Sequence, residues 1–258
     1  MPSKRAQSQA WEDWGAVNPL YAILTDPQYR HGGGDVQAFL RGGEGAVKEI
    51  LSETDRLGIG RSRDAALDFG CGVGRLTGGL ANHFKSVTGV DVAPTMLATA
   101  REIHNRTNLA FRLNRSDDLR WISDSSFDFV LSLLVLQHLN STRAIENFLR
   151  EFVRVLKPGG AIVVQLPLRV PAHRPPLPKW NTRAGLRLRT AKVLRRVGVP
   201  AHVLYERFDW VPEMTLLALS GETARRTFED AGGTIVHVTP PSTDAGGTID
   251  QIYFVTRS

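Results

Sequence analysis

Three glycines stand at alternate positions, 70, 72 and 74, directly after a short apolar run, within the sequence ALDFGCGVGRL of residues 66–76. Asp91 closes the next apolar run, 17 residues after the third glycine. The spacing is G-x-G-x-G, and position 75 holds arginine where a dinucleotide-binding loop would carry its third glycine. A Gly-Lys-Ser/Thr ending for a triphosphate is also absent from this loop. Because an acid such as Asp91 can accept hydrogen bonds from ribose hydroxyls, the pattern predicts a site for a nucleoside.

The elements that position this loop alternate along the chain. Apolar runs predict buried strands, and the segments between them have helical periodicity, the last of these helices ending at Pro-Gly-Gly. Such alternation predicts a parallel sheet covered on both faces. The strands are expected at 65–69, 86–92, 109–114, 127–136 and 161–167, and the helices at 74–84, 93–107 and 141–160.

The chain after residue 219 predicts one more helix and a hairpin. Ser220 is a plausible N-cap for a helix over 220–233, and strands follow at 234–240 and 249–256. The expected fold is therefore α/β and Rossmann-like: a doubly wound, mostly parallel seven-stranded sheet with a C-terminal antiparallel hairpin and a helical lid insertion.

Four motifs in order resemble the class I S-adenosylmethionine-dependent methyltransferases: LDFGCGVGRLT, VTGVDVAPTMLATAR, SDSSFDFVLSLLVLQHL and LREFVRVLKPGGAIVVQLP. The resemblance covers roughly residues 46–166. Short details of the last two motifs are similar to the branch associated with bacterial glycan and glycolipid assembly, whose members methylate sugar hydroxyls. The resemblance implies that the protein transfers a methyl group from S-adenosylmethionine.

The family also implies roles for the cofactor-binding residues. Asp68 would contact the amino end of the methionine moiety, and Asp91 would hold the ribose diol. The other residues of this set would let the backbone pass against the cofactor, pack near the adenine or read its edge. They are Gly70, Cys71, Gly72, Val92, Met96, Asn114 and Asp117.

A hydroxyl acceptor is a poor nucleophile, so a general base would accelerate methyl transfer. His138 follows the fourth predicted strand, at the edge where ligands bind in such sheets, and is predicted to be this base. A structural histidine that caps the following turn is the alternative. Glu44, between two glycines, is predicted to orient His138, although it could equally be a solvated glutamate at a helix start. Substrate contacts are expected from Trp14, Tyr21, Gln137 and Gln165, while the aromatic residues of the N-terminal segment could instead staple that segment to the core.

The net charge of +6 has a local origin. Eleven Lys or Arg and no acid lie between Phe152 and Tyr205, which leaves 21 basic and 26 acidic residues elsewhere. On a helix over 183–197, Leu186, Thr190, Val193, Leu194 and Val197 would form one stripe opposite a basic side. This helix could be a lid with a solvated basic face, or an amphipathic helix that meets anionic lipid or an acidic glycan. RNA is a third alternative, but the scarcity of aromatic residues for base stacking argues against a nucleic-acid partner.

Length and composition predict one domain, residues 1–258. Its expected parts are an N-terminal cap segment (1–45), the cofactor-binding core (46–166), a basic lid or substrate insert (167–218), and the last helix and hairpin (219–258). The chain has one cysteine and lacks an apolar run of the ~20 residues that span a membrane, which favours a cytoplasmic protein. Peripheral attachment to the inner face of the membrane is a further expectation. No metal-ligand spacing is found, so no metal is predicted, and the oligomeric state is left open.

The preferred function is O-methylation of a sugar hydroxyl in an oligosaccharide or glycolipid. A methyltransferase of a small aromatic or quinone metabolite is the alternative, and an apolar acceptor pocket with few polar groups would favour it. An RNA methyltransferase and a non-catalytic module that only binds the cofactor are the remaining alternatives.

Overall fold

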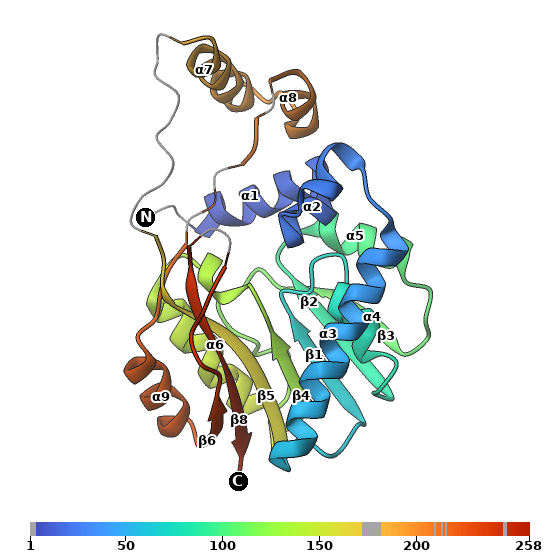
Figure 1. The fold of residues 1–258 in the computed structure, drawn as a ribbon, viewed down its shortest axis with the longest axis vertical. Helices are drawn as coiled ribbons and strands as arrows, with labels where there is room; N and C mark the ends of the chain where they lie inside the picture. The colour runs from blue at the N-terminus through green and yellow to red at the C-terminus, as the bar shows by residue number, and fades with distance from the viewer. Residues whose placement is uncertain (1–3, 172–181, 209, 213, 215, 245–246) are drawn as a thin grey trace.

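The computed structural model describes every residue of the chain except 1–3, 172–181, 209, 213, 215 and 245–246. A single mixed sheet forms its centre (Figure 1). The strand order is β3-β2-β1-β4-β5-β8-β6, with β7 paired to β8. β1 to β5 run parallel, while β8 is antiparallel to both β5 and β6. The strands are β1 (Ala65–Phe69), β2 (Ser86–Asp91), β3 (Leu109–Leu113), β4 (Phe127–Ser132), β5 (Leu156–Arg169), β6 (Gly233–Val238), β7 (Ser242–Thr243) and β8 (Ile249–Arg257).

The predicted sheet is confirmed in its parallel part and in its C-terminal antiparallel strands, but its details differ. The short β7 makes it eight-stranded among the described residues, rather than seven-stranded. β4 ends at Ser132, because the apolar residues after it turn into a 3₁₀ helix, η2 (Leu136–His138). β5 begins at Leu156 and includes the Pro-Gly-Gly expected to end the preceding helix. A bulge in its pairing with β4 accommodates these residues.

Helices cover both faces of the sheet, as expected for strands without a solvent-exposed side. α3 and α4 pack on one face, and α6 and α9 on the other. Neighbouring strand residues point to opposite faces, so that Leu67 joins the cluster under α6 and Ala66 the cluster under α3. The helices are α1 (Lys4–Val17), α2 (Pro19–Leu24), α3 (Val36–Leu57), α4 (Arg75–Leu80), α5 (Pro94–Ile103), α6 (Thr142–Val155), α7 (Arg183–Arg196), α8 (Ala201–Phe208) and α9 (Gly221–Asp230), with a 3₁₀ helix η1 (Pro27–Gly32).

The helix α6 shows how the sequence specifies these elements. Ser141 caps its start by accepting a hydrogen bond from the N–H of Ala144. Buried apolar residues then recur at helical spacing, including Ile145, Phe148 and Phe152. Ser220 caps α9 in the same way, as predicted, and accepts from the N–H of Thr223.

α1 lies above one edge of the sheet, between the sheet and the pair α7–α8 (Figure 1). Glu12 on α1 accepts a hydrogen bond from the N–H of Thr95 on α5 at 3.2 Å. Asp13, also on α1, forms an ion pair with Arg195 on α7 at 2.6 Å. α1 is therefore joined to the core on one side and to the inserted helices on the other. In the part of the chain that the structure describes, no helix has the length and apolar character needed to span a membrane.

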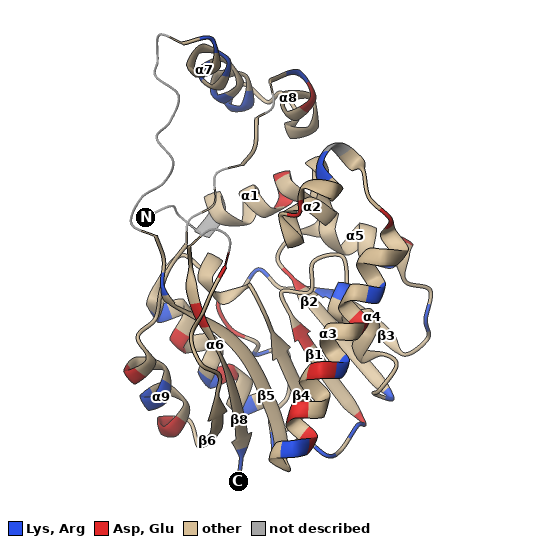
Figure 2. Ribbon diagram, in the orientation of Figure 1, with Lys and Arg blue, Asp and Glu red and all other residues tan. Residues whose placement is uncertain are grey.

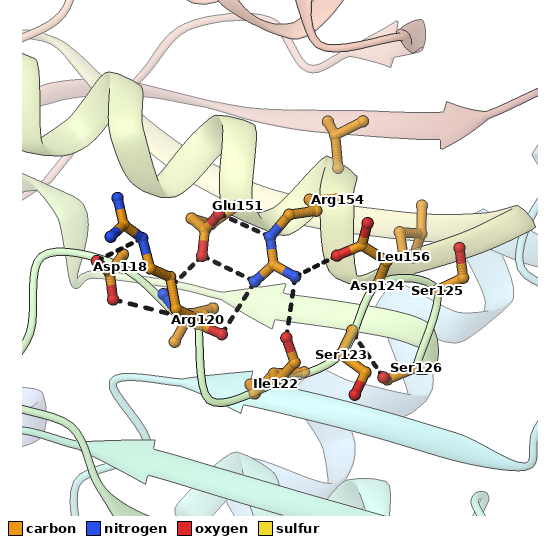
Figure 3. Close-up of polar contacts among 12 residues, drawn as sticks. Asp118, Arg120, Ile122, Ser123, Asp124, Ser125, Ser126, Glu151, Arg154 and Leu156 are labelled. Carbon is orange, nitrogen blue, oxygen red and sulfur yellow. Dashed lines mark hydrogen bonds and ion pairs between the residues drawn. The ribbon is translucent and has the colours of Figure 1, made fainter.

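Arg154, near the end of α6, holds the loop between β3 and β4 in place (Figure 3). Its guanidinium donates to the carbonyl oxygens of Leu119 and Ile122, each at 2.9 Å. It also pairs with Glu151 at 2.8 Å and with Asp124 at 2.6 Å. The hydrogen bond from Arg154 to Glu151 is the main reason why the pKa of this arginine is raised above its ordinary value. One side chain thus ties a long loop to the helix that packs under it.

We expect Arg154→Met to lower the free energy of unfolding by about 2–3 kcal/mol, because partly buried carbonyls and Glu151 lose a charged donor. Urea unfolding of the purified protein measures this change. Arg150→Met is the matched control, since the Arg150 side chain is 46% exposed, against 26% for Arg154, and its ion pair with Glu146 is longer, at 3.3 Å. That variant should lose less than about 1 kcal/mol. Equal losses in the two variants would contradict the role of Arg154.

Candidate active site

A cavity of about 630 Å³ opens where β1, β2 and β4 end. In this sheet the strand order reverses between β1 and β4, which is where ligands bind in doubly wound folds. The loops after the strands form one side of the cavity, and α1 and α2 cover the other side with residues such as Trp11, Trp14 and Ile23. The fold therefore places the predicted nucleoside loop inside a partly covered cavity.

The glycine loop follows β1 and lines the cavity. Gly70 and Gly72 both have positive φ, 77° and 53°. A Cβ atom at Gly70 would collide with Val135, and one at Gly72 would lie 2.8 Å from Ile23. Only glycine therefore combines the required backbone conformation with the narrow space at these two positions.

Asp91 is fixed at the end of β2 by backbone donors. One carboxylate oxygen accepts from the N–H of Gly72 at 2.8 Å, and the other from the N–H of Ala93 at 2.9 Å. Burial raises the pKa of Asp91, and the backbone hydrogen bonds oppose this rise. Because each carboxylate oxygen can accept more than one hydrogen bond, Asp91 keeps acceptor capacity for a ligand in the cavity that it lines.

Asp68 at the end of β1 is almost completely buried and also lines the cavity. Its carboxylate accepts a hydrogen bond from the hydroxyl of Thr77 at 2.6 Å. Burial raises the pKa of Asp68 to about 6, and the charge of Asp91 adds to the rise. A buried carboxylate of this kind gains from a cation placed in the cavity beside it.

Arg75, the first residue of α4, is a site residue that the sequence reasoning missed. Its side chain lines the cavity, yet its buried Nε atom has no hydrogen-bond partner. Its guanidinium carbon lies 5.9 Å from the ring centroid of Phe39. Burial lowers the pKa of Arg75, while Asp68 and Tyr29 act to raise it. The sequence feature that could have identified Arg75 is its position, since this arginine stands where a dinucleotide-binding loop has its third glycine.

The remaining predicted cofactor residues come together in the same cavity. Asn114 begins the loop after β3, and its Nδ2 atom donates to the carbonyl oxygen of Asp118 at 3.1 Å. Met96 on α5 is fully buried, in accord with a role in packing. All nine predicted cofactor residues line the cavity: Asp68, Gly70, Cys71, Gly72, Asp91, Val92, Met96, Asn114 and Asp117.

His138 closes η2, in the loop after β4, and lines the cavity. The ring of Trp11 meets the imidazole edge-on, with ring centroids 5.1 Å apart. Gln137 places its Nε2 atom 3.3 Å from Nε2 of His138. Gln165 on β5 and Trp14 on α1, both predicted substrate contacts, line the cavity as well.

Two predicted residues do not reach this site. Glu44 is exposed on α3, where its carboxylate accepts from the amide of Asn82 at 2.8 Å, so the structure does not support its role in orienting His138. Tyr21 does not line the cavity, and its ring packs against Trp14 with centroids 6.0 Å apart. In both cases the side chain is directed by the packing of N-terminal helices, which local sequence does not determine.

Residues 67–164 match a family model described as a methyltransferase domain. The demethylmenaquinone methyltransferase of Tropheryma whipplei (strain Twist) is 38% identical over 102 residues, covering 39% of this chain and 41% of that protein. The ubiquinone biosynthesis O-methyltransferase of Xanthomonas oryzae pv. oryzae (strain PXO99A) is 33% identical over 108 residues, covering 41% and 44%. The chain therefore spans less than half the length of these curated relatives.

Solved structures share the fold over nearly the whole chain. Magnesium protoporphyrin IX methyltransferase from Synechocystis PCC 6803, with bound SAH, has a TM-score of 0.58 at 16% identity, covering 98% of this chain and 100% of that one. A SAM-dependent methyltransferase from Leishmania major has a TM-score of 0.60 at 16% identity, covering 97% and 83%. At these identities the comparison establishes the fold.

Residues 67–164 thus match a methyltransferase domain, and the chain has the fold of solved SAM-dependent methyltransferases. The Synechocystis enzyme of this fold is known with bound SAM as well as with bound SAH. The relatives named here are quinone methyltransferases, so they favour the quinone alternative over the predicted sugar branch.

Proposed function

We propose that this protein transfers the methyl group of S-adenosylmethionine to a hydroxyl of a small aromatic acceptor of the quinone-precursor type. The observation that carries this proposal is the largely apolar lining of the cavity that contains His138. This lining includes the rings of Trp11 and Phe148 and the side chains of Leu139 and Leu216, and its polar groups are fewer, among them Gln137 beside His138. A flat apolar ring buries its surface against such a wall, whereas a sugar would leave most of its hydroxyls without partners.

Charge supports the proposed position of the cofactor. Asp68 is suited to the ammonium group of the methionine moiety, and Arg75 to its carboxylate, because Asp68 is a buried acid and Arg75 a partly buried cation, both lining the cavity next to the glycine loop in sequence. Asp91 would accept from the ribose hydroxyls. When bound, S-adenosylmethionine supplies the activated methyl group.

His138 acts as the base in this proposal. It takes the proton of the acceptor hydroxyl as the acceptor oxygen bonds to the methyl carbon and the carbon–sulfur bond breaks, which leaves S-adenosylhomocysteine. Trp11 contacts the imidazole of His138 in an edge-to-face arrangement, which fixes the orientation of the base. In this proposal the Trp11 ring also packs against the acceptor ring. The enclosing helices α1 and α2 exclude water and hold the acceptor in line, which is worth about 7–11 kcal/mol in favourable cases.

Methyl-labelled S-adenosylmethionine offered with two acceptors tests the proposal. One is a catechol carrying a short prenyl tail, and the other is an alkyl glucoside of similar length. We expect label in the catechol, and loss of this label in the His138→Ala variant. Label in the glucoside alone would restore the sugar acceptor, and binding of the cofactor without transfer to either acceptor would also count against the proposal.

A further inference from the structure

Three large hydrophobic side chains, two on α7 and one at its C-cap, are more exposed than any other among the described residues. Leu186 is 64% exposed, Val193 57% and Val197, directly after the helix, 74%. They are seven and four residues apart, so on a helix with 3.6 residues per turn they lie along one line. The predicted stripe is thus present in part, but it faces solvent.

The opposite side of α7 already has its own apolar partners. Leu188, Ala191 and Leu194 belong to a cluster with Leu204 of α8 and with Trp210. Leu188, which is not among the residues of the predicted stripe, lies on the side that packs. The exposed aliphatic residues are therefore a second surface on a helix whose packing face is already covered.

Arginines flank the exposed line. Arg189 and Arg196 lie on one side of it and Arg183 on the other, all with exposed side chains. α7 contains no acidic residue and no aromatic residue. In Figure 2 it is marked only by basic residues, at the end of the molecule beyond α1. Aliphatic side chains bordered by cations match the interface of an anionic bilayer, where the apolar groups enter the acyl boundary and the arginines meet phosphates.

We propose that this face of α7 binds the surface of an anionic phospholipid bilayer. Bilayer binding would place the covered cavity beside the lipid, because α7 is joined to α1 by the ion pair of Arg195 with Asp13. α1 in turn contributes Gln7, Ser8 and Trp11 to the cavity wall. An acceptor dissolved in the membrane would then enter past α1. The binding itself does not depend on which acceptor the enzyme methylates.

Co-sedimentation of the full chain with vesicles tests this proposal. Vesicles of phosphatidylglycerol and phosphatidylcholine in equal parts are expected to bind the protein, and phosphatidylcholine alone much less. The triple variant Leu186→Ser, Val193→Ser, Val197→Ser should weaken binding to the anionic vesicles by about tenfold or more. Arg189→Gln and Arg196→Gln should each weaken binding to the anionic vesicles about fivefold, and added salt should weaken the binding of the wild-type protein to the same vesicles.

The control variant carries Arg225→Gln and Arg226→Gln on α9, which removes two exposed arginines far from α7 and should keep vesicle binding. Unchanged binding by the serine triple variant, or equal losses in the α9 variant, would overturn the proposal. Binding of RNA that survives the serine substitutions, without vesicle binding, would assign the face to nucleic acid instead. The serine variant should still methylate a water-soluble acceptor, so this test and that of the proposed function fail separately.

Discussion

His138→Ala is expected to lower kcat by about 10²- to 10⁴-fold, the usual contribution of a general base. The dissociation constant for S-adenosylhomocysteine should stay unchanged, because the proposal assigns the cofactor contacts to Asp68, Arg75 and Asp91. The reason for the large loss is that a neutral hydroxyl attacks poorly unless its proton is taken during the attack. Steady-state methyl transfer to the prenyl catechol and titration calorimetry measure the two quantities.

His83→Ala is the matched control, since His83 is exposed after α4 and does not line the cavity. It should keep both kcat and cofactor affinity. If His138 had a structural role instead, His138→Ala would lower the melting temperature together with kcat, because Trp11 packs on the imidazole that this variant removes. Weaker cofactor binding with unchanged turnover per bound enzyme would remove the assignment of His138 as the base.

Arg75→Met is expected to weaken the binding of S-adenosylhomocysteine by about 10- to 100-fold, the range for a lost charge-assisted hydrogen bond. Methylthioadenosine lacks the methionine carboxylate, so its affinity should not change. Calorimetry with the two ligands therefore separates contact with the carboxylate from a general effect on the loop. Equal losses for both ligands would show that Arg75 acts by supporting the loop.

The melting temperature is a second measurement on the Arg75→Met variant. The buried Nε atom of Arg75 has no hydrogen-bond partner, and the guanidinium carbon lies 5.9 Å from the ring centroid of Phe39. Methionine removes that unsatisfied donor while keeping an unbranched side chain, so the melting temperature of the free enzyme should not fall. Arg115→Met, which changes a second arginine that lines the cavity, serves as the control and should not discriminate between the two ligands.

The cofactor end of the site was predictable because strands and loops of this fold are specified locally. Asp68 and Asp91 end apolar strands, and parallel strands bring their carboxyl ends to one edge of the sheet. The glycines after β1 follow from the backbone conformations that the loop requires. Asp68, Asp91 and the glycines lie together because β1 and β2 pair in parallel, and the apolar pattern of the sequence predicts such parallel strands.

Only the tertiary structure determines which residues cover the cavity and which side of the inserted helix α7 is exposed. Helical periodicity shows that a helix has faces but not which face meets a partner, so Glu44 reached Asn82 instead of His138. Arg75 belongs to the site because α3 packs beside α4 and encloses its side chain next to Phe39. On α7 the sequence determined an apolar and basic helix. Only the packing of α8 against Leu188 and Ala191 decided that Leu186 and Val193 face outward, because contacts between distant segments select the buried side.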